Sequence, residues 1–487
     1  MIPPHSALPL LLAASPAANG FSARELFIQV AYLAASVLFI MGLRGLTAPD
    51  KARRGMQLAA LGMLVAVVGT LLNHEIVRFE WIVAGLIVGS LVGAAISIWM
   101  PMTAIPQRTA ISHAFGALAA TLVGIEHYLH LRALGTVGRV DMAALGFEVM
   151  FGSLTITGSL MAFAKLQGLV RSAPITYRFQ NASNIALFFL ALALFLGLIA
   201  VPSTHGAHAA MFYAMVLLGL AVGVLLVLPI GGADMPVVIS LLNSYAGLAS
   251  CATGFALDNN VLIIAGALDG ASGFLLSVLM SKAMNRSFAN VLFGAFGGGD
   301  ATAAAAASVT GTVRSISVED AAIQLAYARS VLVVPGYGMA VAQAQHQVRE
   351  LAELIERRGG EVRYAIHPVA GRMPGHMNVL LAEANVPYDR LFDMDEINDQ
   401  FARTDVALVI GANDVVNPAA RNDPSSPIHG MPILNVDQAQ SVIVLKRSMN
   451  PGFAGIENAL FFDPKCAILF GDAKTSLTHL VTAVKAA

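Results

Sequence analysis

The sequence is poor in charge and in cysteine. Only 12% of its 487 residues are charged, whereas a soluble protein usually carries about 25%. The composition therefore excludes an ordinary soluble protein over the whole length. A net charge of -1 provides no basic footprint for nucleic acid. The two cysteines, Cys251 and Cys466, lie far apart in an apolar segment and in a mixed one, so we expect buried thiols rather than a structural disulfide.

The first 20 residues lack a basic segment, although they are apolar and rich in proline. A secretory signal peptide normally begins with positive charge. We therefore expect residues 1–22 to form an N-terminal extension, and a cleaved signal stays the alternative.

Long apolar runs fill the first half of the chain. A membrane-spanning helix needs about 20 mostly apolar residues, and nine segments meet this condition. Most are rich in Gly, Ala and Ser, which suits close packing of helices in lipid. The expected spans are residues 25–44, 56–72, 80–100, 109–130, 142–163, 184–201, 208–229, 236–256 and 260–281. The sequence thus predicts a multi-pass helical membrane domain over residues 23–286.

Lys and Arg are distributed unevenly between the two sides of this predicted domain. With the N-terminus outside, the inner side carries Arg44, Lys51, Arg53, Arg54, Arg108, Lys165, Arg171, Arg178, Lys282 and Arg286, and the outer side carries Arg24, Arg78, Arg132 and Arg139. Because Lys and Arg accumulate on the cytoplasmic side, nine spans would place the C-terminal half in the cytoplasm.

A few polar residues lie within or beside the predicted spans, where each is costly. His113 and Asn243 are candidates for a proton or ion path, because histidine changes protonation and asparagine orders water. A packing role for His113 and a helix-bridging role for Asn243 stay open. Asp234, in the loop between spans seven and eight, either caps a helix or orders the loop, or it contacts the soluble domain or the inner mouth of such a path. Other polar residues are Glu148 and Asp269, whose roles the sequence leaves open, and Glu126, His127 and His130, which we expect at the membrane interface.

The second half of the chain has a different pattern. Residues 287–314 are rich in Gly and Ala, which predicts a flexible linker, although the Ala run can form a helix. From residue 330 strand-like runs alternate with helical ones, which predicts a doubly wound parallel α/β sheet over residues 315–487. Strands are expected at 330–335, 361–367, 388–393, 405–411, 432–436 and 441–446, and helices at 339–358, 376–385, 395–402 and 473–485.

The first expected strand leads into Gly336-Tyr-Gly-Met-Ala-Val341, a turn with two of the three glycines of a dinucleotide-binding fingerprint. A plain strand-to-helix turn is the alternative. The second strand ends Ala365-Ile-His-Pro368 without the acid that usually binds the NAD ribose. Lys446, Arg447 and Ser448 instead close the last expected strand, and two cations with a hydroxyl suit the 2′-phosphate of NADP. A solvated basic pair is the other interpretation.

Two further loops lie where ligands bind in open α/β sheets. Residues 411–417 follow the fourth expected strand, and Asn413 and Asp414 there are either ligand contacts or simple turn formers. Residues 369–376 precede a helix, and their glycines and Arg372 suit a phosphate contact.

With these motifs in place, the chain resembles the β subunit of the proton-translocating NAD(P) transhydrogenases. The resemblance rests on residues 336–345, 367–378, 392–398, 411–414 and 446–450 in the second half and on 231–236, 242–247 and 283–288 in the first. It covers nearly all of residues 25–487. It implies a membrane domain followed by a Rossmann-like NADP(H)-binding domain.

The resemblance also implies an activity. We expect hydride transfer between NAD(H) on a partner α subunit and NADP(H) on this chain, with Si/Re specificity, coupled to proton movement and usually forming NADPH. A dimer of such heteromers in a bacterial inner membrane is implied. No metal is expected.

Individual residues carry roles by the same resemblance. His113, Asn243, Asp234 and Asp414 match residues of the proton path and its coupling, and residues 449–455 match a mobile loop over the nucleotide in which Phe453 stands where Tyr is common. Motifs and resemblance together give as nucleotide contacts Gly336, Tyr337, Gly338, Met339, Ala340, Val341, Val369, Ala370, Gly371, Arg372, Met373, Pro374, Gly375, Gly411, Ala412, Asn413, Asp414, Val415, Gly430, Met431, Lys446, Arg447, Ser448, Met449, Asn450, Gly452, Phe453, Gly471, Asp472 and Ala473.

One alternative function remains open at this point. A channel or transporter regulated by a cytoplasmic NADP(H)-sensing domain would show the same two-part layout. A self-sufficient membrane dehydrogenase is excluded, since no quinone, flavin or metal-ligand motif is evident in the sequence.

Overall fold

The computed structural model describes residues 23–46, 49–72, 79–101, 104–171, 175–231, 234–284, 288, 312–371, 375–424, 426, 428–452 and 454–487. Most of the expected extension (1–22) and linker (287–314) lies outside these ranges. By compactness the chain divides into two units, residues 1–90 and 91–487. The domain boundaries expected at residues 286 and 315 stay predictions.

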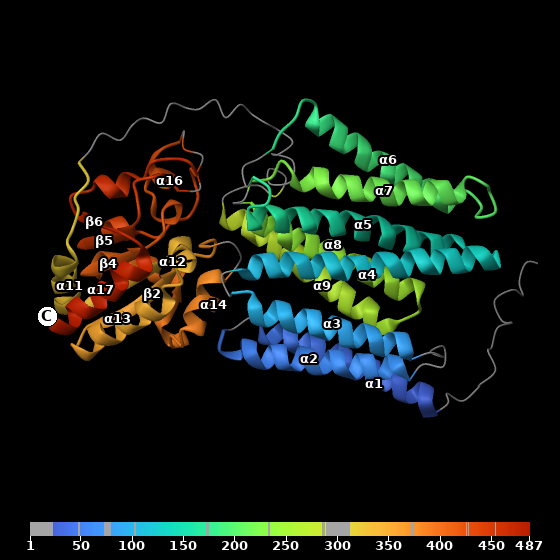
Figure 1. Cartoon of the computed structure of the whole chain (residues 1–487), viewed down its shortest axis with the longest axis horizontal. Coiled ribbons are helices and arrows are strands. Elements are labelled where there is room, and N and C mark those ends of the chain that lie inside the picture. The colour runs from blue at the N-terminus through green and yellow to red at the C-terminus, as the bar shows by residue number, and fades with distance from the viewer. Residues whose placement is uncertain are drawn as a thin grey trace, which may run out of the picture. The chain divides into compact units, whose positions relative to one another are not determined.

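The described residues include nine helices that are long and apolar enough to cross a membrane, as expected (Figure 1). They are α1 (Ala23–Gly45), α2 (Pro49–Leu71), α3 (Glu80–Trp99), α4 (Ile105–Leu134), α5 (Arg139–Gln167), α6 (Gln180–Ala200), α7 (His208–Val227), α8 (Met235–Ala256) and α9 (Asn260–Ala283). At 30 and 29 residues, α4 and α5 exceed the roughly 20 that a bilayer requires.

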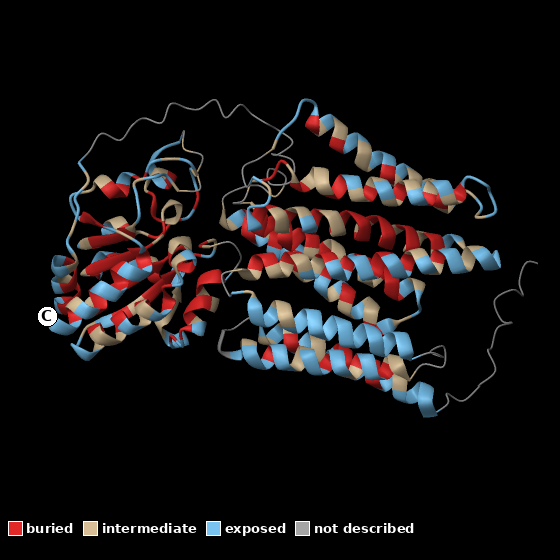
Figure 2. Cartoon of the chain, viewed as in Figure 1, coloured by how far each residue is buried: buried red, intermediate tan, exposed pale blue. Residues whose placement is uncertain are grey.

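Burial is unequal among these helices. α5 and α8 are the most buried, whereas no residue of α3 is buried (Figure 2). Small residues let α4, α5, α7, α8 and α9 approach closely. A Cβ added to Gly247 of α8 would lie 2.4 Å from the Gly270 nitrogen of α9, and one on Gly223 of α7 would lie 2.2 Å from the Leu154 oxygen of α5. The Gly and Ala content noted in the sequence thus serves helix contact.

The C-terminal part is a six-stranded sheet in the order β3-β2-β1-β4-β5-β6, with every neighbouring pair parallel. This confirms the expected doubly wound fold. The strands are β1 (Ser330–Pro335), β2 (Glu361–Ile366), β3 (Leu391–Asp393), β4 (Val406–Ile410), β5 (Ser441–Lys446) and β6 (Cys466–Phe470). The chain order reverses between β1 and β4, which lie side by side at the centre.

Helices and helical turns cover both faces of the sheet. They are α11 (Val318–Tyr327), α12 (Tyr337–Ala342), α13 (Gln345–Arg357), α14 (His376–Glu383), α15 (Met394–Ile397), α16 (Ala419–Asn422) and α17 (Ala473–Ala486), with 3-10 turns η2 (Tyr388–Arg390), η3 (Asn398–Arg403), η4 (Asp414–Val416), η5 (Val436–Gln438) and η6 (Ala459–Phe462).

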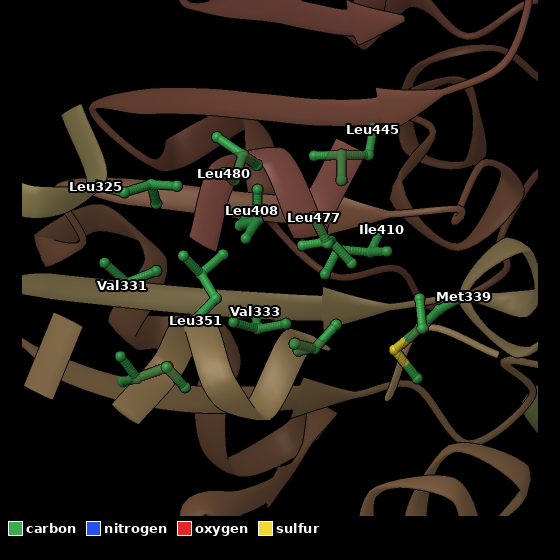
Figure 3. Close-up of a cluster of buried hydrophobic side chains, with 14 of the residues drawn as sticks. Leu325, Val331, Val333, Met339, Leu351, Leu408, Ile410, Leu445, Leu477 and Leu480 are labelled. Carbon is green, nitrogen blue, oxygen red and sulfur yellow. The ribbon is translucent and has the colours of Figure 1, made fainter. Parts of the chain in front are cut away.

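Two apolar clusters hold the sheet, one on each face. Alternate strand residues divide between them: Val331 and Val333 of β1 pack with Leu351 of α13 and Leu477 of α17 (Figure 3). Their neighbour Leu332 packs with Phe401 and other residues of the opposite face. A strand buried on both faces reads as a continuous apolar run, which explains why β1 was recognisable in sequence.

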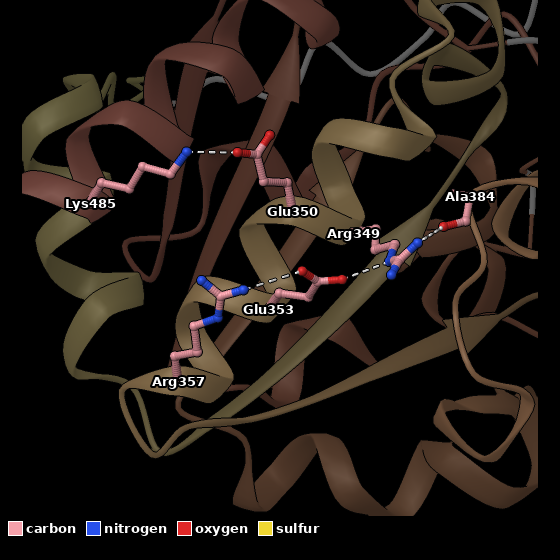
Figure 4. A network of polar contacts seen from close by, with 6 residues as sticks. All are labelled: Arg349, Glu350, Glu353, Arg357, Ala384 and Lys485. Carbon is pink, nitrogen blue, oxygen red and sulfur yellow. Dashed lines mark hydrogen bonds and ion pairs between the residues drawn. The ribbon is translucent and has the colours of Figure 1, made fainter.

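Ion pairs on the exposed side of α13 contribute less to stability than these apolar clusters do. Glu353 pairs with Arg349 at 2.7 Å, and Arg349 also donates to the Ala384 carbonyl after α14 at 2.8 Å (Figure 4). Glu350 pairs with Lys485 of α17 at 2.7 Å. Such half-exposed pairs contribute about 0.2–1 kcal/mol each, so they orient the helices more than they stabilise the domain.

Three expectations about these elements were wrong. Residues 432–436 form no strand, because their backbone groups bond elsewhere: the Pro432 carbonyl accepts from His367, and the Ile433 carbonyl accepts from Asn398. β6 was missed. The helix expected over 339–358 is broken between α12 and α13, where Gln343 adopts a left-handed conformation with φ of 50°.

Candidate functional site

Two strand-to-helix turns touch at the centre of the sheet, beyond the carboxyl ends of β1 and β4. The Gly338 nitrogen donates to the Gly411 oxygen at 2.9 Å, and a Cβ on Gly338 would lie 2.7 Å from the Gly411 Cα. A Cβ on Gly336 would lie even closer to the neighbouring turn, 2.4 Å from the Ala412 nitrogen. Gly411 has φ of +64°, which favours glycine. Only glycines permit this contact at the point where strand order reverses, the usual ligand position in such folds.

A pocket of about 360 Å³ opens at this edge of the sheet. Its volume lies in the range of small-molecule sites, roughly 300–1,000 Å³. Thirteen of the expected nucleotide contacts line it, namely Gly338, Val341, Gly411, Ala412, Asn413, Lys446, Arg447, Ser448, Asn450, Gly452, Gly471, Asp472 and Ala473; Ala342, Leu445 and Pro451 complete the lining. The end of β5 and the segments that follow β1, β4, β5 and β6 are therefore brought together.

Other expected contacts lie elsewhere. Met339 and Ala340 are buried in the apolar core, with Tyr337 packed against it, and Val415 and Met449 pack on the opposite cluster. Met431 packs with Ala420 and Ile433. Gly336 starts the first turn, Val369, Ala370, Gly371 and Gly375 follow β2, and Gly430 follows α16. Arg372, Met373, Pro374 and Phe453 lie outside the described residues. A nucleotide role for all of these stays a prediction.

Lys446, Arg447 and Ser448 give the pocket a basic rim at the end of β5. Arg447 and Ser448 are exposed. The Lys446 ammonium lies 4.3 Å from the ring centre of Phe461, a cation–π contact. Burial lowers the pKa of Lys446, and the Asp414 charge acts in the opposite direction. The arrangement offers two cations and a hydroxyl to an anion at the pocket.

Asn413 and Asp414 do more than form a turn. The Ala454 nitrogen donates to Asp414 Oδ2 at 2.9 Å. Asn458 Nδ2 donates to the Asn413 carbonyl at 3.0 Å, and Asn417 Nδ2 donates to the Glu457 carbonyl at 3.0 Å. These contacts tie Ala454, Glu457 and Asn458 to the turn after β4; we call residues 450–452 and 454–458 the pocket loop.

His367 occupies the end of β2 where the usual fingerprint has an acid. Its Nε2 donates to the Pro432 carbonyl at 2.8 Å, and its Nδ1 accepts from the Val369 nitrogen at 3.2 Å. Burial lowers the pKa of His367 to about 4, with the Pro432 carbonyl acting in the opposite direction. The neutral ring therefore fixes the loop after β2.

The membrane helices bring two of the polar candidates into direct contact. Asn243 Nδ2 of α8 donates to Asp269 Oδ1 of α9 at 3.0 Å. Ser240 and Ser244 of α8 donate to the Gly273 and Gly270 carbonyls of α9 at 2.9 and 2.7 Å. The hydrogen bonds and the Gly247 contact lock the pair of helices together. Asp269, whose role the sequence left open, is thus the partner of Asn243.

The remaining membrane candidates lie on other elements. His113 of α4 is half-buried, and its Nδ1 is buried with no hydrogen-bond partner among the described residues. Asp234 is the N-cap residue of α8. Glu126 and His130 are exposed and His127 is half-buried. Cys251 and Cys466 are free thiols; Cys466 is buried as expected, whereas Cys251 is only half-buried.

Comparison with known proteins identifies the family. The model of the family described as NAD(P) transhydrogenase beta subunit matches residues 28–483. The chain belongs to this family. It is 49% identical over 462 residues to the NAD(P) transhydrogenase subunit beta of Rhodospirillum rubrum, covering 94% of this chain and 98% of the relative. The same identity and coverage hold for the subunit from a named strain of that species.

As a transhydrogenase β subunit, the chain is a membrane protein that works with NAD(P)(H) and with an α subunit. Two residues of structural weight were missed in the sequence. Lys165 is 1% exposed and donates to the Ile230 carbonyl at 2.8 Å, although its position beside a span suggested only a topology signal. Asn458 gave no signal at all, because its importance depends on contact with a residue 45 positions away.

Proposed function

We propose that this β subunit binds NADP(H) in the pocket at the end of β1, β4 and β5. The observation that supports it best is the basic rim: Lys446, Arg447 and Ser448 stand at the pocket beside glycines whose backbone can approach a pyrophosphate. The end of β2 carries His367 in place of the acid that favours NAD. The donor set and the volume thus fit a phosphorylated dinucleotide.

In the proposed reaction, a partner α subunit presents NAD(H) and hydride passes between the two nicotinamides with Si/Re specificity. The bound cofactors supply the hydride chemistry. The residues of this chain bind and orient: Lys446 and Arg447 neutralise phosphate charge, and the pocket loop, held by Asp414 and Asn458, covers the site. Hydride transfer requires the reacting carbons to approach within about 3–3.5 Å, so the position of this loop controls the rate.

The second part of the proposal is proton coupling. His113, Asn243 and Asp234 would form the membrane path and its inner mouth, and Asp414 would link the path to nucleotide affinity. The Asn243–Asp269 hydrogen bond supports this role, as does His113 Nδ1, which has no hydrogen-bond partner in the described part of the chain, because polar groups inside a membrane are costly and usually functional. Coupling requires that a protonation state favour one of two conformers.

We further propose a dimer of αβ units in a bacterial inner membrane, with the C-terminal domain in the cytoplasm. The excess of Lys and Arg on the inner loops supports this orientation. NADPH formation driven by inward proton flow is the expected direction.

The decisive experiment uses the chain assembled with its α partner in sealed vesicles. NADH-dependent reduction of an NADP analogue is followed together with internal pH. We expect reduction with an uncoupler-sensitive pH change. Tight NADP(H) binding without reduction, in an assembled complex, would instead support a transporter with a nucleotide-sensing domain.

A binding measurement tests the pocket separately. The R447A substitution should weaken NADP⁺ binding roughly 10- to 100-fold, as expected for a lost charge-assisted contact, while NAD⁺ binding changes little. Titration calorimetry on the full chain measures both. If R447A weakened the binding of NADP⁺ and NAD⁺ equally, Arg447 would not be a contact of the 2′-phosphate.

A further inference from the structure

One face of α5 carries a row of buried polar side chains with one glycine among them. Glu148, Gly152, Thr155 and Ser159 follow one another at intervals of four, three and four residues, so they lie along one side of the helix. Glu148, Thr155 and Ser159 are all 0% exposed. The Ser159 hydroxyl has no hydrogen-bond partner among the described residues.

A matching face of α4 lies against this row. His113, Ala117, Thr121 and Gly124 follow at intervals of four, four and three residues. A Cβ added to Gly152 would lie 2.3 Å from Thr121 Oγ1 and 3.4 Å from the Ala117 carbonyl oxygen. The two faces therefore meet.

At the end of this contact that lies away from His113, Gly124 of α4 meets Glu148 of α5. A Cβ on Gly124 would lie 2.9 Å from the Glu148 Cδ and 3.0 Å from its Oε1. The space that the carboxyl occupies thus exists because residue 124 has no side chain. We call the polar residues His113, Thr121, Glu148, Thr155 and Ser159 the α4–α5 seam.

The surroundings of Glu148 are unusual for a carboxyl. Neither oxygen has a hydrogen-bond partner of good geometry in the described part of the chain; the Gly124 backbone and the Thr253 hydroxyl are among its polar neighbours. That hydroxyl donates to the Ala249 carbonyl at 3.1 Å, so it can only accept from Glu148. No ion pair involves Glu148 among the described residues.

A carboxyl in this position is suited to carry a proton. Burying an uncompensated charge costs several kcal/mol, whereas a protonated carboxyl can donate to Thr253. His113 and Gly124 lie eleven residue steps apart on α4, about 16 Å of helix. This is too far for one direct transfer, and the hydroxyls of the seam lie between the two ends.

We propose that Glu148 is a proton-carrying residue of the membrane path, between His113 and the turn that joins α4 to α5. The inference rests on the proton movement proposed above and adds a residue to it. Glu148 takes up and releases a proton at its own end of the seam, and the hydroxyls between connect it with His113; no covalent bond to carbon changes.

The test compares E148Q with E80Q, which makes the same change at an exposed position of α3. Both are assembled with the α partner in sealed vesicles. In E148Q we expect proton movement and coupled steady-state turnover to fall at least about tenfold, the usual scale for loss of a proton-transfer group. Single-turnover hydride transfer between prebound nucleotides should stay within about twofold. E148D, which keeps the carboxyl, should recover part of the coupled rate.

A second pair of variants covers the case in which E148Q fails to assemble. G124A fills the space at the carboxyl, whereas G116A makes the same change on α4 with no neighbour within 4 Å. We expect G124A alone to slow coupled turnover. Infrared difference spectra between NADP⁺- and NADPH-loaded wild-type protein should also contain a protonated-carboxyl C=O band that G124A shifts and G116A leaves in place.

The outcomes separate this inference from the proposed function. Full coupled turnover in E148Q, or equal behaviour of G124A and G116A with no such infrared band, overturns the role of Glu148 alone. Absence of any proton movement in the wild-type complex overturns the coupling itself, and the inference with it.

Discussion

Lys446 and Asp414 show how one charge supports another at the pocket. Burial against Phe461 lowers the pKa of Lys446, and the Asp414 carboxylate opposes that effect. The same carboxylate accepts a hydrogen bond from the pocket loop. Asp414 therefore links the charge of the basic rim to the position of the pocket loop. From the sequence we could predict that Asp414 lies near the nucleotide, but not that it makes these two contacts.

His367 provides a pH-dependent prediction. Its folded-state pKa, about 4, lies below the ordinary value of 6.5, so the unfolded chain binds more protons between these values. Its contribution to stability is complete above about pH 6.5 and is lost as pH falls toward 4. We expect H367Q, which keeps a donor for Pro432 but does not titrate, to reduce the loss of hydrogen-exchange protection in β2 between about pH 7 and about pH 5.

The matched control is H479Q, at an exposed position of α17. Protection factors corrected for the intrinsic exchange rate are measured on the full chain. If H367Q and H479Q both showed the same pH dependence of protection as wild type, the His367 ring would not be the cause of the loss of protection at low pH.

At the scale of elements, side-chain hydrogen bonds hold the pocket loop to the turn after β4. Asn458 donates to Asn413 and also accepts from the Leu460 nitrogen at the start of η6. N458D keeps the acceptor and loses the donors. We expect nucleotide affinity to fall roughly fivefold, the equivalent of about 1 kcal/mol for one hydrogen bond, mainly through faster release measured by stopped flow. Unchanged release would mean that the loop is held by its other contacts.

The α8–α9 pair gives a prediction about packing. A Cβ at Gly247 would meet the backbone of Gly270 at 2.4 Å. G247A should therefore destabilise the helix pair by about 1–3 kcal/mol, the usual cost of overpacking, and should weaken the Asn243–Asp269 hydrogen bond. Detergent-unfolding curves measure it against G85A in α3, where no atom lies within 4 Å. Equal stability of the two variants would contradict this packing.

Elements with a clear hydrophobic pattern could be predicted from the sequence, whereas those that depend on tertiary contacts could not. The apolar run of β1 and the amphipathic pattern of α13 were enough to predict a strand and a helix. Residues 432–436 look like a strand by composition, but Asn398 and His367 take their carbonyls. β6 is five residues long, and its place beside β5 follows from pairing that composition does not encode.

At the scale of the whole molecule, hydropathy divided the chain correctly into spans and an α/β domain, because the energetic contrast between lipid and water is large. The glycine turn and the basic rim were also readable, since each is a short local pattern. The α4–α5 seam was not: it depends on the register of two helices, which brings Gly152 onto Thr121 and Gly124 onto Glu148.

Orientation is the last prediction. Lys474 and Lys485 are exposed on α17. We expect trypsin to cut the C-terminal domain in inside-out membrane vesicles and to leave it intact in right-side-out ones, as judged by a C-terminal epitope. Cleavage in intact right-side-out vesicles would reverse the topology inferred from Lys and Arg.

The strand order has a consequence for biosynthesis. Gly471, Asp472 and Ala473 line the pocket and directly follow β6, which comes after every membrane helix in chain order. All nine described spans are therefore translated before the proposed nucleotide pocket is complete. We expect a chain truncated before Cys466 to insert into the membrane and to pair with its partner without binding the nucleotide, and so to inhibit the complex.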